Sequence, residues 1–364
     1  MPIRFTVVAA LAAAFTSGAH AQWQVTNLSP GPSHRHSTGY AGGPGTQGGA
    51  VYVGAWPAGN YHASVWSSTA DSWVDLHPTT PNAINARSMV HAVSGNHQAG
   101  FVEGIGGGPS HASLWSGTAA SFTDLHPDGY SSSIIRGMDA TSQVGSAASG
   151  GAPQAGLWHG SSSSFVNLHP AGLYYSNAYG VSGNRQVGSA GNFGAGFGHA
   201  VMWSGSAASM IDLHPAGRSQ SAAFAISGNQ QVGQVDNTAA LWSGTAASYV
   251  SLEPSGADGS LLNATDGTRQ VGWARINNRL HAGLWTGTAA SFFDLHTLLP
   301  ASFTTSEARA VWTDATGVHV LGHAQDLSDS SHAILWTFVV PAPGATALFS
   351  IAALALASRR RLPS

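Results

Sequence analysis

Residues 111–127 read His-Ala-Ser-Leu-Trp-Ser-Gly-Thr-Ala-Ala-Ser-Phe-Thr-Asp-Leu-His-Pro, and variants of this stretch recur along most of the chain. Each copy has an apolar phrase ending in Trp, a Gly- and Ser-rich turn, and a second phrase built around Leu. Short apolar segments separated by tight turns are typical of β-strands. We predict that the seven Trp residues pack between repeat units, each with its indole N–H hydrogen-bonded; they are Trp66, Trp115, Trp158, Trp203, Trp242, Trp285 and Trp336.

Two further landmarks also occur seven times, and successive Trp residues are 39 to 51 positions apart. The Leu of the second phrase is Leu28, Leu76, Leu125, Leu168, Leu213, Leu252 and Leu295. The second landmark is a Gly that ends a Gln-Val-Gly-like phrase, and we identify its seven copies as Gly54, Gly100, Gly145, Gly188, Gly233, Gly272 and Gly322. Four short strands in about 45 residues are typical of one propeller blade.

The two ends of the repeat region complement each other. The chain enters this region in the middle of a unit, at the Leu phrase of residues 23–30, and leaves it after the Trp phrase of residues 332–336. An open stack of repeats would need polar caps instead. The sequence therefore predicts an all-β, seven-bladed β-propeller over residues 22–340, closed by N- and C-terminal strands. A β-solenoid and a different blade count are the alternatives.

The Trp phrase resembles the extracellular HAF repeats, which are named for a His-Ala-Phe sequence before Leu-Trp. The resemblance covers roughly residues 62–336 and implies an extracellular repeat protein without established catalysis. The third position departs from the family pattern, since it is never Phe; it is Ser64, Ser113, Gly156, Val201, Ala240, Gly283 or Ile334.

Residues 1–21 have the pattern of a secretory signal peptide. Arg4 precedes an apolar run over residues 7–15, and the small residues Ala19 and Ala21 mark a cleavage site that would leave Gln22 first. A buried N-terminal helix is the alternative.

Residues 341–364 combine a Pro-rich breaker, an apolar run over residues 345–357 and a basic end. This order predicts a transmembrane helix with a cytoplasmic basic stop, and a plain C-terminal anchor is the alternative. The segment resembles the PEP-CTERM sorting signals of Gram-negative bacteria that make exopolysaccharide, although Ala342 stands where that motif has Glu. The resemblance implies an exosortase-like sorting peptidase as a partner, an inner-membrane precursor and delivery to the cell surface or beyond. The residues of this signal are Pro341, Ala342, Pro343, Gly344, Arg359, Arg360 and Arg361.

Charge and composition exclude some classes of protein. Between the two terminal segments, nine Arg face sixteen carboxylates, a net charge of −7, and the chain has no Lys. Phosphate backbones need basic surface, so nucleic acid is excluded as a partner. The chain also lacks Cys, so its stability has to come from packing and repeat stacking.

Polar residues recur at two positions of the repeat. Where His is absent from them, Gln154, Thr238, Ser29 or Glu253 stands instead. These types share hydrogen-bonding ability rather than metal affinity, which indicates a structural role and no metal site. For the Asp before the repeated Leu we expect hydrogen bonds to a turn. The histidines are His62, His111, His199, His281 and His332 at the first position, and His77, His126, His169, His214 and His296 at the second.

Signatures of catalysis are weak. The chain has no Gly-x-Ser-x-Gly elbow, its Gly-rich stretches do not lead into helices, and its carboxylates show no paired pattern. We therefore predict no catalytic residue and no cofactor. The predicted function is a non-catalytic cell-surface or matrix protein that binds extracellular polysaccharide or a surface protein, or is purely structural. A polysaccharide hydrolase or lyase with a carboxylate pair in the channel is the alternative. Candidate ligand contacts are the off-pattern aromatics Trp56, Tyr61, Tyr130, Tyr174, Tyr175 and Phe193.

Between residues 22 and 340, seven histidines lie outside the repeated phrases, and these are the ones we expect to be exposed and to titrate near pH 6.5. Mild acid would then bring the surface towards neutrality and strengthen association with anionic polysaccharide. These residues are His34, His36, His91, His97, His159, His319 and His323.

Overall fold

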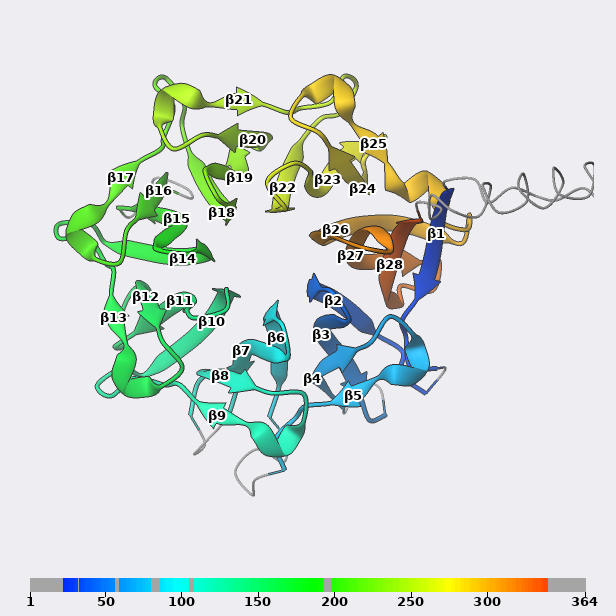
Figure 1. Cartoon of the computed structure of the whole chain (residues 1–364), viewed down its shortest axis with the longest axis horizontal. Coiled ribbons are helices and arrows are strands. Elements are labelled where there is room, and N and C mark those ends of the chain that lie inside the picture. Colours follow the sequence, from blue (N-terminus) through cyan, green and yellow to red (C-terminus); the bar gives the residue numbers. More distant parts are fainter. Residues whose placement is uncertain are drawn as a thin grey trace, which may run out of the picture.

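The computed structural model describes residues 22–339, except residues 32, 56–58, 80–85, 105–107 and 193–197. Seven four-stranded antiparallel sheets surround a central channel as blades (Figure 1). The predicted seven-bladed propeller is therefore confirmed. The signal-peptide and sorting-tail predictions concern residues outside the described ranges. Within those ranges, no helix has the length and apolar character needed to cross a membrane.

Each blade runs from an innermost strand at the channel to a short outermost strand. The first two blades are β2 (Ser37–Gly43), β3 (Thr46–Val53), β4 (Asn60–Trp66), β5 (Val74–Asp75), and β6 (Ser88–Ser94), β7 (His97–Val102), β8 (His111–Trp115), β9 (Thr123–Asp124). The next two are β10 (Ser132–Met138), β11 (Gln143–Ala148), β12 (Gln154–Trp158), β13 (Val166–Asn167), and β14 (Tyr175–Ser182), β15 (Arg185–Gly191), β16 (His199–Trp203), β17 (Ile211–Asp212).

The fifth and sixth blades follow the same plan, and short 3-10 turns precede the outermost strands. These blades are β18 (Ser221–Ser227), β19 (Gln230–Val235), β20 (Thr238–Trp242), β21 (Val250–Ser251), and β22 (Ser260–Thr265), β23 (Gln270–Ile276), β24 (Arg279–Trp285), β25 (Phe293–Asp294). The turns are η1 (Ala70–Ser72), η3 (Ala119–Ser121), η4 (Ser162–Ser164), η5 (Ala207–Ser209), η6 (Ala246–Ser248), η7 (Ala289–Ser291) and, after β25, η8 (Leu295–Leu298).

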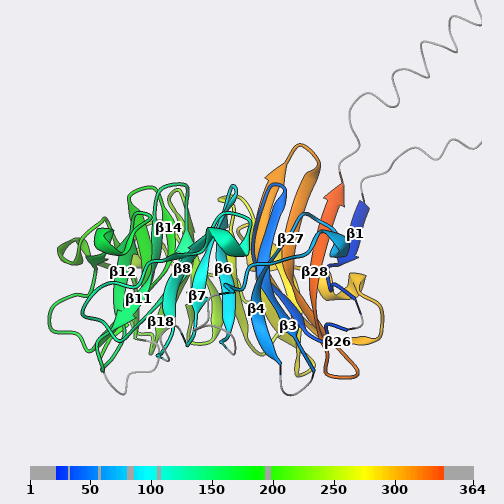
Figure 2. The same cartoon turned by 90° about the horizontal axis from the view of Figure 1, so that it is seen from below.

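The seventh blade closes the ring with strands from both ends of the described chain. β26 (Phe303–Asp314), β27 (Gly317–Asp326) and β28 (Ser331–Val339) are joined by β1 (Gln22–Asn27) as the outermost strand. β1 pairs with β28 along its whole length, from Gln22 opposite Val339 to Asn27 opposite Ile334. This is the closure that the complementary ends predict. It also places the two ends of the described chain together on one face (Figure 2).

The seven Trp side chains fill the spaces between blades, and each is fully buried. Trp66 packs in one cluster with Leu28 and Leu335 of the seventh blade, and Trp115 packs with Leu76 of the first. Burial of so large an apolar area at every blade junction is a main source of the stability of this repeat fold.

The prediction that every indole N–H is paired is wrong for five of the seven. Trp158 donates to the Leu125 carbonyl oxygen at 2.9 Å and Trp285 to that of Leu252 at 3.0 Å, but the other five find no acceptor among the described residues. In those two blades a Gly stands two positions before the Trp, and a Cβ there would come within 2.8 Å of the indole ring. The indole reaches its acceptor only where that Cβ is missing.

A serine hydroxyl joins each blade to the next. Its Oγ accepts the backbone N–H of an Ala in the third strand of the preceding blade, as in Ala112 to Ser133 at 2.9 Å. At the closure, Ala333 donates to Ser37 at 2.9 Å. The seven serines are Ser37, Ser88, Ser133, Ser176, Ser221, Ser260 and Ser306.

The repeated histidines complete these junctions. His126 Nδ1 lies 2.8 Å from Ser133 Oγ, its ring stacks on His111 at 4.0 Å, and His111 Nδ1 lies 2.9 Å from Asp124. Asp124 also accepts the backbone N–H of His126, which is the turn role expected for the repeated Asp. Where this His is replaced, Ser29 and Glu253 hydrogen-bond the corresponding serines instead. A hydrogen-bonding side chain is what this position requires.

Every innermost strand has a β-bulge at the same place, opposite a glycine of the second strand. In the second blade the register shifts between Val90 and Ala92, and Gly100 pairs with Val90. A Cβ on Gly100 would lie 1.9 Å from the Met89 carbonyl oxygen, and the other six glycines of this set give 1.8 to 2.0 Å. A side chain cannot fit there, so the bulge requires glycine.

In the first blade this glycine is Gly49, not Gly54 as the sequence pattern suggested. Gly49 pairs with Gly39, and its Cβ would lie 1.8 Å from the Thr38 carbonyl oxygen. Gly54 follows the end of β3 with φ of +102° and serves the turn there. The assignment failed because the first repeat has Gly48 and Gly49 in succession where the later repeats have Val, Ala or Leu before the Gly.

Replacing Gly188 by Ala should destabilise the protein by at least about 2 kcal/mol, because the new Cβ would lie 1.8 Å from the Asn177 carbonyl oxygen. Gly151→Ala is the matched control: nothing lies within 4 Å of its Cβ, and we expect a change within about 0.5 kcal/mol. Denaturant unfolding of the two variants measures the difference. Equal stabilities would show that the bulge tolerates a side chain.

Candidate functional site

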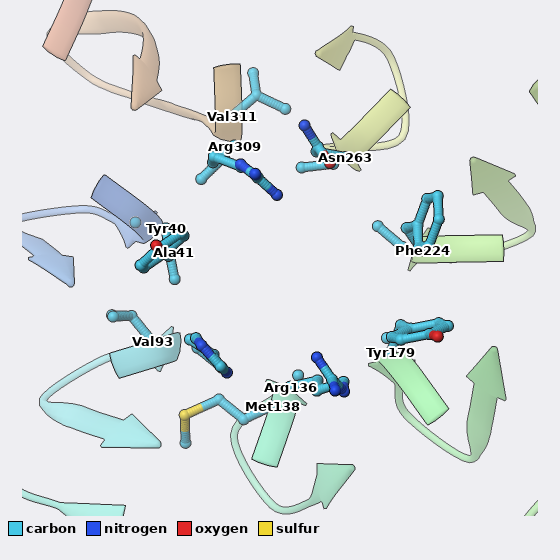
Figure 3. A pocket seen from close by; sticks show the side chains of 18 of the residues that line it. Tyr40, Ala41, Val93, Arg136, Met138, Tyr179, Phe224, Asn263, Arg309 and Val311 are labelled. Carbon is cyan, nitrogen blue, oxygen red and sulfur yellow. The ribbon is translucent and has the colours of Figure 1, made fainter. Parts of the chain in front are cut away.

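The seven bulges turn one side chain per blade towards the channel, and Figure 3 labels those of Tyr40, Arg136, Tyr179, Phe224, Asn263 and Arg309 around it. A β-bulge re-aims the extra residue while the flanking strand continues its pairing. We call this set the bulge ring. In every blade the next residue is Ala or Gly, which leaves room for the ring side chain. The bulge ring consists of Tyr40, His91, Arg136, Tyr179, Phe224, Asn263 and Arg309.

The bulge ring lines a cavity of about 610 Å³ in the channel. Pockets that hold small organic ligands are roughly 300–1,000 Å³. Two positions after the ring residue, five blades contribute an apolar side chain to the same cavity: Val93, Met138, Val181, Ile226 and Val311. The cavity therefore has the size of a small-ligand site, with a chemically mixed ring next to an apolar one.

The charge of the cavity has the opposite sign to that of the protein body. The body carries nine Arg and sixteen carboxylates, whereas the cavity is lined by Arg136, Arg309 and one carboxylate, Glu307. Arg309 Nη2 lies 2.9 Å from Glu307 Oε2, and Asn263 donates to the other carboxylate oxygen at 3.1 Å. With its histidines neutral, the cavity thus carries a net charge of +1 inside a negative protein.

The two arginines lie on opposite sides of the channel, each beside an aromatic ring (Figure 3). The Arg136 guanidinium lies 5.6 Å from the centre of the Tyr179 ring, and that of Arg309 lies 5.8 Å from the centre of the Tyr40 ring. The structure places no described carboxylate within ion-pair distance of Arg136. Arg136 is thus the cation of the cavity that remains to be neutralised.

Two histidines near the bulge ring stay neutral near neutral pH: His91, which lines the cavity, and His323 on β27, whose ring centre lies 6.3 Å from that of Tyr40. Burial, assisted by the charge of Arg136, lowers the pKa of His91 to about 4. Burial lowers the pKa of His323 to about 4 as well, although Glu307 opposes the shift. Neutral imidazoles here leave the two arginines as the cations of the cavity.

The expectation that all seven off-phrase histidines are exposed is wrong for four of them. His36 and His319 are buried, and burial lowers the pKa of His36. His91 and His323 are partly buried, and burial lowers the pKa of both. The fold shields these four histidines from solvent although they fall outside the repeated phrases. The proposed charge change near pH 6.5 therefore loses most of its candidates.

The aromatic residues chosen from the sequence do not line the cavity where the structure describes them. Tyr61 packs edge-on against Tyr52 at 5.4 Å, and Tyr130 packs against Phe165 at 5.0 Å. Tyr174 is half exposed, and Tyr175 begins β14. Trp56 and Phe193 lie outside the described residues. The aromatics that do line the cavity are Tyr40, Tyr179, Phe224 and Trp273.

The sequence contains a signal for the bulge ring that was missed. In each repeat, a variable residue is followed by Ala or Gly a few positions before the turn into the second strand, as in Ala-Tyr179-Gly and Ala-Phe224-Ala. This variable residue before Ala or Gly, together with the Gly that follows in the second strand, predicts the position of the bulge.

The cavity does not offer the carboxylate pair that glycosidases use. Among the described residues that line it, Glu307 is the sole carboxylate, and it is already bound to Arg309 and Asn263. Across the described ranges, no cluster of three His, Cys, Asp or Glu side chains is arranged to hold a metal ion.

Comparisons with known proteins support the fold alone. No protein-family model matches the chain, and no curated protein matches its sequence. The chain is similar in structure to the propeller domain of the Trilobed protease from Pyrococcus furiosus, with a TM-score of 0.51, 6% identity, and coverage of 83% of this chain and 94% of that one. That domain is described as having an open velcro topology, whereas here β1 and β28 close the ring.

Two longer peptidases are also similar. A prolyl endopeptidase gives a TM-score of 0.50 at 8% identity, with 84% of this chain and 51% of that one covered. Pyrococcus horikoshii acylaminoacyl peptidase gives 0.52 at 6% identity, with 85% and 52% covered. The present chain spans about half the length of these two. At such identities the likeness extends to the propeller architecture and to no activity.

The neutral histidines predict a loss of stability in acid. The unfolded chain binds protons at His91 and His323 below about pH 6.5, whereas the folded protein does so only near pH 4. Stability is therefore full above pH 6.5 and falls as the pH drops towards 4, by on the order of 2 kcal/mol per histidine. Thermal unfolding from pH 7 to pH 4.5 measures this slope. It should flatten in a His91→Gln/His323→Gln variant, and an unchanged slope would contradict the assignment.

Proposed function

We propose that this protein is a non-catalytic binding module of the cell surface or extracellular matrix, and that its ligand enters the central channel. The bulge ring is the observation that carries this proposal. At one position per blade, the fold presents Tyr, His, Arg, Tyr, Phe, Asn and Arg to a single cavity. The serine, Trp and His positions of the blade junctions, in contrast, are nearly uniform. A mixed set of side chains around one cavity is what selective recognition of a ligand needs.

A polysaccharide-active enzyme on the same scaffold is the competing function. Propellers carry many activities, so the fold does not choose between the two. The cavity favours binding, because its one carboxylate is held in an ion pair and has no facing acidic partner among the described lining residues.

A saccharide panel separates binding from hydrolysis. We expect the protein to retain at least one extracellular saccharide without releasing shorter products. Phe224→Ala should weaken that retention about tenfold, because it removes an aromatic face from the channel. Tyr174→Ala is the control, since Tyr174 is a half-exposed aromatic that does not line the cavity. Product release would favour the enzyme, and equal effects of the two substitutions would place the ligand elsewhere.

The proposal includes export and sorting through the two terminal segments. Residues 1–21 would direct secretion, and residues 341–364 would hold the precursor in the inner membrane until a sorting peptidase acts. Gln22 at the start of β1 pairs with Val339 at the end of β28, so both segments join the propeller on the same face of the ring. A precursor held in the membrane would then keep this face of the propeller near the membrane.

Deleting residues 341–364 should convert a membrane-associated protein into one released to the medium, because this segment is the proposed anchor. Changing Arg359, Arg360 and Arg361 to Gln should weaken retention without abolishing export. Cell fractionation followed by immunoblotting reads out both variants. Recovery of the deletion variant in the membrane fraction would rule out the anchor.

A further inference from the structure

We propose that the ligand of the channel is a saccharide unit that carries a single carboxylate, anchored by Arg136. This inference rests on the proposed binding function and specifies its ligand class.

The first reason is the state of Arg136. Four of the eight other arginines of the body are neutralised by carboxylates: Arg87 by Glu103, Arg218 by Asp236, Arg269 by Asp266 and, in the cavity, Arg309 by Glu307. Arg136 projects into the cavity and has no such partner among the described residues. Its planar guanidinium matches a carboxylate through two parallel hydrogen bonds.

The second reason is the charge on the opposite side of the channel. On that side, Glu307 already forms an ion pair with Arg309, so an anionic ligand group near Arg309 would be repelled by the Glu307 carboxylate. The cavity can therefore compensate one negative charge, at Arg136, and disfavours ligands with several. This selects against phosphates of nucleotides and favours a monoanionic group.

The third reason is the sequence of chemical groups around the ring from the third blade to the sixth. Beside Arg136 lie Tyr179 and Phe224, whose rings make an edge contact with centres 5.2 Å apart, and Asn263 follows. Aromatic side chains present large apolar faces, against which the C–H face of a sugar ring packs. The Asn263 N–H groups donate to Glu307 and to the Ala308 carbonyl oxygen, which leaves the amide oxygen to accept from a sugar hydroxyl. Cation, aromatic wall and amide together match an acidic sugar with its carboxylate at Arg136.

Calorimetric titration of the full-length protein with methyl galacturonoside, a sugar acid that carries one carboxylate, tests this inference. Arg136→Gln should weaken binding about 10- to 100-fold, as expected for loss of a charge-assisted hydrogen-bonded pair. Arg279→Gln removes the same charge from the exposed start of β24 and should change binding less than about twofold. Equal losses in the two variants would overturn the inference, since net charge alone would then explain them.

Two further ligands separate the carboxylate from other causes. The methyl ester of methyl galacturonoside keeps the sugar ring but loses the charge, and it should bind wild type as weakly as the acid binds Arg136→Gln. Inorganic sulfate should not displace the acid at equal concentration. Tight binding of the ester would overturn the carboxylate assignment and leave the binding module intact. Displacement of the acid by sulfate would show that the site binds small anions in general and is not selective for a sugar acid. If neutral saccharides bind and the acid does not, the proposed ligand class is wrong.

A second variant tests the sign of the charge effect. Glu307→Gln removes the opposing carboxylate and leaves Arg309 unneutralised, so the acid should bind several-fold more tightly. A melting curve recorded beside the titration checks that the variant is folded. Weaker binding by a folded Glu307→Gln protein would contradict the charge balance on which the inference depends.

Discussion

The close approach of a glycine in the second strand to a carbonyl oxygen of the innermost strand is the constraint on which this molecule depends. It permits a bulge at the same place in all seven blades, and the bulge turns one residue per blade into the channel. The innermost strand also carries the serine whose hydroxyl accepts a hydrogen bond from the preceding blade. Strand pairing, blade packing and the composition of the cavity are thus coupled within each repeat.

The repeat separates structural polar groups from those available to a ligand. The serines, the paired histidines such as His111 and His126, and Asp124 satisfy one another at the blade junctions. Their hydrogen bonds are local, so each blade can carry them unchanged. The bulge ring differs from blade to blade, and it gives a positive cavity to a protein whose body is negative. Binding specificity can therefore change without changing the fold.

Much of the fold could be predicted from the sequence, because the blade is a local pattern repeated seven times. The Trp and Leu landmarks gave the blade number, and the complementary ends gave the closure by β1 and β28. The candidate site could not be found in this way. A bulge interrupts the two-residue period of a strand, and the ring brings together residues about 45 positions apart in the chain. From the sequence, aromatic residues in the connecting segments, such as Tyr174, are therefore the expected ligand contacts, whereas Tyr179 and Phe224 are the ones that line the channel.

The most direct measurement for this account is a crystal structure of the protein grown with methyl galacturonoside. It predicts ligand density in the channel at the level of the bulge ring, with one carboxylate on the Arg136 guanidinium and a sugar face against Tyr179 or Phe224. An empty channel, with the saccharide ordered on the outer edges of the blades or on the connecting loops, would contradict it.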